Sequence, residues 1–127
     1  MHIHHLGIAS DDADAAADRF ARMLDGQICH RETLDDVSVT MLDVSNGYLE
    51  FLEPSGDGTI KRFLDRQGPG MHHIAFETND IRAALERATA LDIQLVDTEP
   101  RPGAMGHEVA FLHPTSLGGV LVEFVET

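Results

Sequence analysis

Two stretches of this 127-residue chain begin alike, and this internal repeat limits the folds that the chain can adopt. The first stretch reads HHLGIA and contains His5, and the second reads HHIAFE and contains His73. Alternation of side chains in both is typical of strands. Seven residues after each histidine comes an aspartate that can cap a helix, Asp12 or Asp80. The sequence therefore predicts two copies of one unit, each opening with a strand that carries a histidine.

The rest of the chain repeats the same order of elements. Turn signals, such as Ser45-Asn46-Gly47, separate short alternating runs. The expected strands are 3–9, 27–32, 37–44 and 48–53 in the first half and 72–78, 93–96, 107–112 and 119–125 in the second, with helices at 13–24, 59–66 and 80–91 and a loop at 98–106. On the first helix, Phe20, Met23 and Leu24 are expected to join one apolar stripe.

This order predicts an α+β fold in which two βαβββ repeats form one curved mixed sheet with a cup. We expect a single domain over residues 1–127, because a chain of this length buries about two-thirds of its unfolded surface. Repeat one is expected at about 1–54, a linking helix at about 59–66 and repeat two at about 71–127.

Composition excludes several classes of partner. The 22 acidic residues against 9 basic ones give a net charge of −13, which argues against nucleic acid and anionic membrane surfaces. Cys29 is the only cysteine, which suits a reducing compartment and predicts a cytoplasmic protein. We expect it to be a small buried residue and no nucleophile. The dispersed acidic surface suggests solubility in high salt, and the alternative is an ordinary acidic cytosolic protein.

The histidine strands and the last strand of each half supply candidate metal ligands. If the helices cover one face of each sheet, His5 and His73 point to the other, concave face. Glu50 and Glu123 lie in apolar strands, where a carboxylate is costly to bury unless it is paired or binds a metal. A lone strand histidine is more often a core or surface residue, but the repeated pattern favours a four-ligand site. Nitrogen and carboxylate ligands suit a divalent ion such as Co²⁺, Mn²⁺, Ni²⁺ or Zn²⁺, which would sit in the cup.

The paired histidine strands resemble those of the vicinal oxygen chelate superfamily, also called the glyoxalase/bleomycin resistance superfamily. Several further segments resemble the methylmalonyl-CoA epimerase family within it. These are LEFLEP at 49–54, the helix at 60–64, GMHHIAFE at 70–77, DTEPRPGA at 97–104, FLHP at 111–114 and GGVLVE at 118–123. The resemblance covers nearly the whole chain.

The resemblance implies an isomerase of propionate metabolism that interconverts the 2R and 2S forms of methylmalonyl-CoA. By position, the metal ligands of the family fall on His5, Glu50, His73 and Glu123. The metal would chelate the thioester carbonyl and the free carboxylate of the substrate and stabilise the enolate that forms when the α-proton leaves.

The resemblance also implies which residues transfer protons. Glu123 is the first candidate, in addition to its role as a ligand. Some family members carry a second catalytic glutamate in the strand where this chain has Val39. Glu50 is the candidate to replace it, and Glu77 is a further candidate on the same strand face as His73.

Substrate contacts are expected from two parts of the chain. Arg62 and Arg101 are candidates for contacts with CoA phosphates, although an exposed loop arginine such as Arg101 can serve solubility alone. The loop that contains Ser116, Gly118 and Gly119 is a candidate to offer backbone N–H groups to the substrate carboxylate. The alternative for this loop is a plain hairpin connection.

Two rival functions remain open. One is a glyoxalase-like or other metal enzyme on the same scaffold, and the other is a small-molecule-binding protein of that fold without catalytic activity. The resemblance further implies a homodimer.

Overall fold

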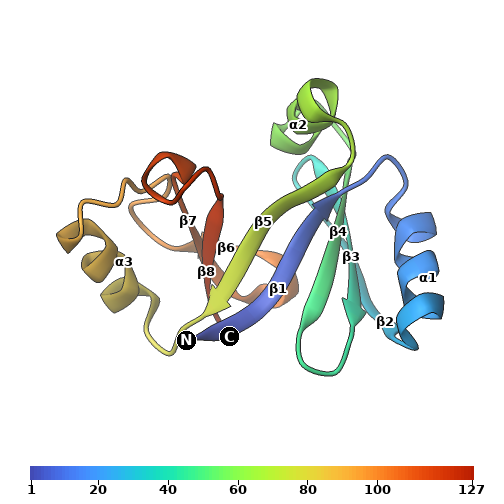
Figure 1. The fold of residues 1–127 in the computed structure, drawn as a ribbon, viewed down its shortest axis with the longest axis horizontal. Helices are drawn as coiled ribbons and strands as arrows, with labels where there is room; N and C mark the ends of the chain where they lie inside the picture. Colours follow the sequence, from blue (N-terminus) through green and yellow to red (C-terminus); the bar gives the residue numbers. More distant parts are fainter. The chain divides into compact units, whose positions relative to one another are not determined.

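Both predicted strand–helix repeats are present in the structure, a computed structural model that describes residues 1–127 (Figure 1). The elements are β1 (His2–Ala9), α1 (Ala13–Leu24), β2 (Gln27–Leu34), β3 (Val37–Asp43), β4 (Tyr48–Pro54), α2 (Thr59–Gln67), β5 (Gly70–Glu77), α3 (Ile81–Ala90), β6 (Arg101–Pro102), β7 (Glu108–Leu112) and β8 (Val122–Glu126). Two 3₁₀ turns, η1 (Ala104–Gly106) and η2 (Pro114–Ser116), lie beside β7.

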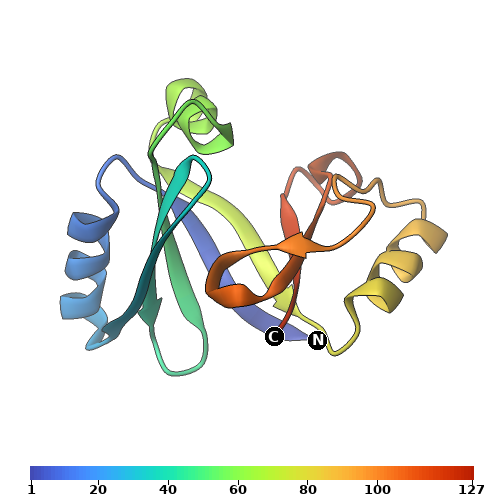
Figure 2. The same cartoon turned by 180° about the vertical axis from the view of Figure 1, so that it is seen from behind.

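The chain divides into a first unit, His5–His72, and a second unit, Met1–His4 with His73–Thr127. In the first unit the strands follow the order β2-β3-β4-β1, with β4 parallel to β1 and the other pairs antiparallel (Figure 2). In the second unit the order is β5-β8-β7-β6, with β5 parallel to β8. The α+β class and the βαβββ order of both repeats are therefore confirmed, while the single domain and the metal-containing cup stay predictions.

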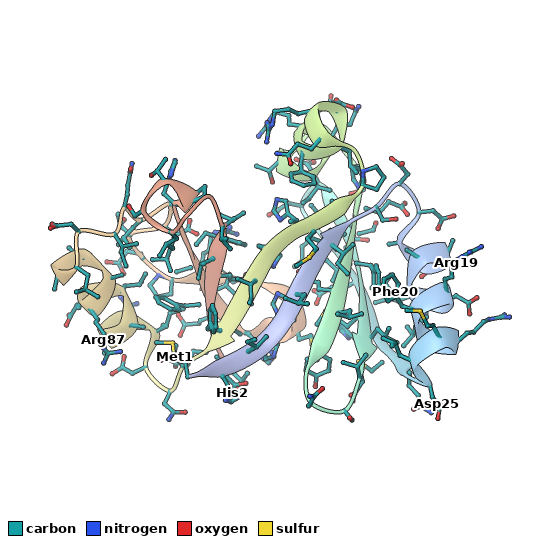
Figure 3. The ribbon with its side chains drawn as sticks, in the orientation of Figure 1. Met1, His2, Arg19, Phe20, Asp25 and Arg87 are labelled. Atoms are coloured by element: carbon teal, nitrogen blue, oxygen red, sulfur yellow. The ribbon has the colours of Figure 1, made fainter.

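One helix packs on one face of the strands in each unit. In the first unit, Ala13 and Ala17 of α1 pack with Leu42 and Phe51. Figure 3 shows Phe20 pointing from α1 towards these strands. In the second unit, α3 packs on β7 and β8 through a cluster that comprises Ile81, Leu85, Ala88, Ala110 and Leu112. None of the helices has both the length and the apolar character needed to cross a membrane.

The apolar stripe predicted for α1 is only partly correct. Phe20 packs against the first unit's core, but Met23 and Leu24 are 68% and 48% exposed. The small side chains of Ala13 and Ala17 are the ones that lie against the strands, and the last turn of α1 leaves its apolar side chains in solvent.

The predicted strand at 93–96 is absent. Leu95 forms only an isolated bridge with Leu112, and Ile93 packs against the α3 cluster. The second strand of the repeat is instead β6, whose Arg101 lies opposite Val109. β6 lies in the segment 98–106, which the sequence predicts to be a loop. Proline has no backbone N–H and is therefore restricted to the edges of sheets, and β6, which contains Pro102, is an edge strand.

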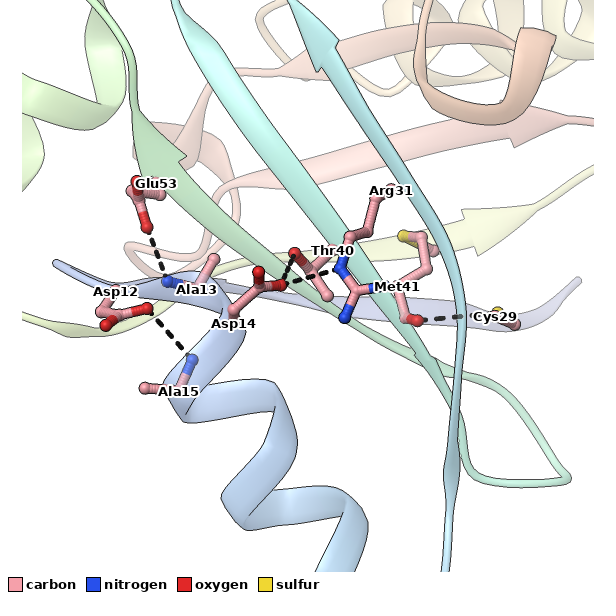
Figure 4. Close-up of polar contacts among 9 residues, drawn as sticks. All are labelled: Asp12, Ala13, Asp14, Ala15, Cys29, Arg31, Thr40, Met41 and Glu53. Atoms are coloured by element: carbon pink, nitrogen blue, oxygen red, sulfur yellow. Dashed lines mark hydrogen bonds and ion pairs between the residues drawn. The ribbon is translucent and has the colours of Figure 1, made fainter.

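The two repeats cap their helices in the same way. The Asp12 carboxylate accepts a hydrogen bond from the N–H of Ala15 at 3.1 Å (Figure 4), and Asp80 accepts one from Ala83 at the same distance. A glutamate of the last strand adds a second contact in each unit. Glu53 accepts from the N–H of Ala13 and Glu126 from that of Ile81, both at 2.8 Å.

Replacing Asp80 by alanine is expected to lower the free energy of unfolding by about 1 kcal/mol, because the N–H of Ala83 loses its acceptor. Urea denaturation followed by circular dichroism measures this change. The exposed neighbour Asn79, replaced by alanine, is the control and should have little effect. An equal loss for both variants would show that the cap contributes nothing specific.

Candidate metal centre

The first unit places His5 and Glu50 together on the face of its strands that α1 does not cover. Gly7 of β1 lies opposite Glu50 of β4, so His5, two residues before Gly7, shares a face with Glu50. The neighbours Ile8 and Phe51 point the other way and pack with the α1 cluster. His5 Nε2 lies 3.5 Å from Glu50 Oε1, and both side chains are buried.

The second unit repeats this arrangement. Ala75 of β5 lies opposite Glu123 of β8, and His73 precedes Ala75 by two residues. Phe124, the next residue after Glu123, points the other way and packs against the α3 cluster. His73 Nε2 lies 3.4 Å from Glu123 Oε1, and both side chains are buried. Each histidine–glutamate pair therefore occupies the same place in its repeat.

These pairs fit the donor set of a divalent cation. Two ligand atoms at about 2.0–2.2 Å from one tetrahedral ion lie roughly 3.3–3.6 Å apart. The nitrogen–oxygen separations of 3.5 Å and 3.4 Å fall in that range. His5, His73 and Glu123 each offer one atom that can ligate a metal ion, and the fourth predicted ligand, Glu50, lies beside His5. A small residue, Gly7 or Ala75, lies opposite each glutamate.

A chain of contacts runs from His73 to the surface of the second unit. The ring of Phe111 meets the His73 ring edge-on at 5.3 Å, and the Arg101 guanidinium lies 5.4 Å from the centre of the Phe111 ring. Asp97 accepts hydrogen bonds from Arg101 Nε at 3.2 Å and from the N–H of Phe111 at 2.8 Å. Arg101, a predicted CoA contact, is thus held over an aromatic neighbour of His73, with its side chain half exposed.

The other predicted substrate contacts lie on the surface. Arg62 is exposed on α2 and donates to the carbonyl of Asp57 at 3.3 Å.

In the loop at 116–119, the Ser116 hydroxyl accepts a hydrogen bond from the N–H of Gln94 at 3.2 Å. Gly118 and Gly119 have φ of +67° and +86°, a conformation that favours glycine. The N–H of Gly119 donates a hydrogen bond to the carbonyl of Pro114 at 2.9 Å, so this N–H already has an acceptor within the loop.

The expectation that Cys29 is buried is wrong. Cys29 lies in the edge strand β2 and is exposed, and its thiol is directed at the carbonyl of Met41 at 3.6 Å (Figure 4). Partial desolvation of the thiol, followed by the nearby charge of Asp43, raises the pKa of Cys29 above its usual value. The thiol therefore stays protonated at neutral pH, which agrees with the prediction that it is no nucleophile.

A second histidine–glutamate contact in the first unit has no counterpart in the sequence predictions. His30 Nε2 lies 2.8 Å from Glu32 Oε1 in β2. The two residues are two positions apart, so the sequence predicts that they share a face of the strand. It does not indicate which of the two faces that is.

Residues 4–111 match the family model described as the Glyoxalase/Bleomycin resistance protein/Dioxygenase superfamily. The chain belongs to this superfamily. The chain is also 37% identical to human mitochondrial methylmalonyl-CoA epimerase over 125 residues, covering 95% of this chain and 71% of the human protein. An uncharacterised Bacillus subtilis protein, YqjC, is 35% identical over 127 residues, which is 98% of this chain and 91% of that protein.

Solved structures give the same assignment. A methylmalonyl-CoA epimerase in complex with methylmalonyl-CoA and NH₄⁺ superposes with a TM-score of 0.92 and 35% identity, covering 99% of this chain and 94% of that one. The predicted membership of the methylmalonyl-CoA epimerase family of enzymes, and of the glyoxalase fold, is therefore confirmed.

Proposed function

We propose that this protein epimerises methylmalonyl-CoA by removing and returning the proton at C2. The observation that carries the proposal is the pair of buried histidine–glutamate contacts at equivalent positions of the two repeats. Relatives named methylmalonyl-CoA epimerase, which cover nearly all of this chain, supply the substrate class.

His5, Glu50, His73 and Glu123 are proposed to hold one divalent cation, with Co²⁺, Mn²⁺, Ni²⁺ and Zn²⁺ as the candidates. Their separations within each pair and their burial support this role. When bound, the cation would supply positive charge that stabilises the negative charge developing on the substrate oxygens. Burial strengthens this effect because few water molecules screen the charge.

Glu123 is proposed to be the carboxylate that takes the C2 proton. The C2–H bond lies between a thioester and a carboxylate, so its electron pair can move into the thioester carbonyl as the proton moves to a Glu123 oxygen. Inversion requires a second group that returns a proton to the opposite face of C2. Glu50 is the sequence-based candidate for that second transfer and stays a prediction.

The CoA part of the substrate is proposed to meet basic and backbone donors at the surface. Arg62 is exposed on α2, where its guanidinium is accessible to a phosphate. Arg101 is half exposed and is the second candidate. In the loop with Ser116, Gly118 and Gly119, backbone N–H groups are proposed to contact the substrate carboxylate. A homodimeric state and a cytoplasmic location stay predictions.

Deuterium exchange tests the proposed function directly. The purified protein is stripped of metal, reloaded with Co²⁺ or Mn²⁺, and incubated with racemic methylmalonyl-CoA in D₂O, and mass spectrometry follows deuterium at C2. We expect exchange that depends on the added cation. Cation binding without exchange would favour another metal enzyme of this scaffold, such as a glyoxalase-like one. Neither binding nor exchange would favour a small-molecule-binding protein.

A further inference from the structure

A β-bulge in β2 changes which way its side chains point. Ile28 lies opposite Leu42, and the next paired residue, His30, lies opposite Met41, so Cys29 is an extra residue in the strand. Ile28 and Leu42 both pack on the α1 side of the first unit. Regular alternation would put His30 on that side as well. The bulge instead turns His30 and Glu32 to the opposite face, and bulges often re-aim side chains in this way beside active sites.

Neighbouring contacts agree with this orientation. Arg31, between His30 and Glu32, donates to Asp14 of α1 at 2.9 Å and so faces the helix (Figure 4). Glu32 lies opposite Val39 of β3, and Val39 lies opposite Leu52 of β4, which follows Glu50 by two residues. Since directly opposed residues share a face, Glu32 lies on the same face of the first unit as Glu50.

The His30–Glu32 contact differs from the two proposed ligand pairs. Its nitrogen–oxygen distance is 2.8 Å, a normal hydrogen bond, whereas the His5–Glu50 distance is 3.5 Å. Its side chains keep 35% and 24% of their surface exposed, against 4% and 9% for His5 and Glu50. Glu32 thus combines a position on the site face, a hydrogen-bonded imidazole and access to water.

We propose that Glu32 is the second proton-transfer carboxyl of the reaction and that His30 holds it in place. The inference rests on the proposed epimerase function. In one direction, Glu123 takes the C2 proton and the electron pair of the C–H bond moves into the thioester carbonyl. The pair then returns to C2 as the protonated Glu32 gives its proton to the opposite face. The reverse reaction uses Glu32 as the base and Glu123 as the acid, so no oxidant or further reactant is needed.

Two considerations favour Glu32 over Glu50 for this step. After each turnover Glu123 carries an extra proton and the second carboxyl has lost one. A carboxyl that contacts water and an imidazole can take up or release a proton readily before the next turnover. With Glu50 in this role both proton-transfer carboxyls would be buried, whereas Glu32 gives the pair one member with access to water. Spacing also fits, because His30, Met41 and Glu50 are aligned across three neighbouring strands. Two strand spacings amount to roughly 10 Å, so His30, which contacts Glu32, lies about that far from Glu50 on the same face.

Glu32→Gln should separate proton exchange from inversion. The cation-loaded full-length protein is incubated in D₂O with the 2R or the 2S epimer separately. Mass spectrometry measures deuterium at C2, and an indicator enzyme that consumes only one epimer measures conversion. In the wild type we expect both. In Glu32→Gln we expect conversion to fall at least about 100-fold, while the epimer whose proton faces Glu123 still exchanges with retention of configuration.

Controls separate this result from damage to the fold or to the cation site. Thr33→Ala changes an exposed neighbour on the other face and should convert both epimers normally. The affinity of Glu32→Gln for Co²⁺, measured from the visible absorption of the bound ion, should match that of the wild type. His30→Gln, which keeps a hydrogen-bond donor, should retain more conversion than His30→Leu if His30 positions Glu32.

Other outcomes overturn the inference in distinguishable ways. Normal conversion by Glu32→Gln would exclude Glu32 from proton transfer while leaving the epimerase function intact. Separation of exchange from conversion in Glu50→Gln, with the cation bound, would assign the second transfer to Glu50. Absence of exchange in the wild type would reject the proposed function itself.

Discussion

For the epimer whose C2 proton faces Glu123, supplied separately, Glu123→Gln is expected to reduce cation-dependent exchange at C2 by about 10²–10⁴-fold, the range that general acid–base groups contribute. The amide that replaces the carboxylate has nearly the same shape and keeps an oxygen that can ligate a metal ion. It cannot accept the C2 proton, so the loss should appear in the turnover rate. The rate of deuterium incorporation, measured at saturating substrate and saturating Co²⁺, checks this expectation.

The chain contains a matched control three residues further along the same strand. Glu126 points to the other face of β8, where it accepts a hydrogen bond from the N–H of Ile81. Glu126→Gln removes the same charge but retains an acceptor oxygen, so exchange should stay within a few-fold of the wild type. A loss of ten-fold or less in Glu123→Gln at saturating cation would remove Glu123 from proton transfer. Recovery of exchange on raising Co²⁺ alone would limit its role to holding the cation.

The sequence predicts most of the fold because its signals are periodic and occur twice. The start of α1 follows from Asp12, and the end of β3 follows from the Ser45-Asn46-Gly47 turn. The association of each histidine with its glutamate was also predictable. Histidine and glutamate lie on parallel partner strands in each repeat, and the same residue offset places them on one face.

Features that depend on one-residue shifts or on tertiary contacts were not predictable from this pattern. The bulge at Cys29 reverses the faces of His30 and Glu32, and nothing in the local alternation marks it. β6 consists of only Arg101 and Pro102 and is defined by its pairing with β7. Gly103 is needed beside it, because a Cβ there would lie 2.6 Å from Val109 Cγ1. Such contacts exist only once the strands have come together.

Phe51→Ala is expected to lower the free energy of unfolding by about 3–5 kcal/mol, the usual range for removing a buried aromatic ring. Phe51 is completely buried and is among the largest fully buried side chains of the protein. Its ring lies 5.4 Å from that of Phe20, and it packs in the cluster that joins α1 to β3 and β4. Alanine would leave a cavity that α1 cannot fill without shifting along the strands. Urea denaturation, monitored by circular dichroism, measures the change in unfolding free energy.

Met23→Ala is the matched control for this variant, since Met23 belongs to α1, the helix that packs on Phe51, but is 68% exposed. We expect its effect to stay within about 0.5 kcal/mol, as for surface substitutions in general. A loss below about 1 kcal/mol for Phe51→Ala would mean that α1 repacks around the cavity. A loss for Met23→Ala comparable with that of Phe51→Ala would show that the apolar end of α1 is covered in solution. Since Glu50 precedes Phe51 in β4, packing of Phe51 beneath α1 is also what directs the Glu50 carboxylate to the opposite face, beside His5.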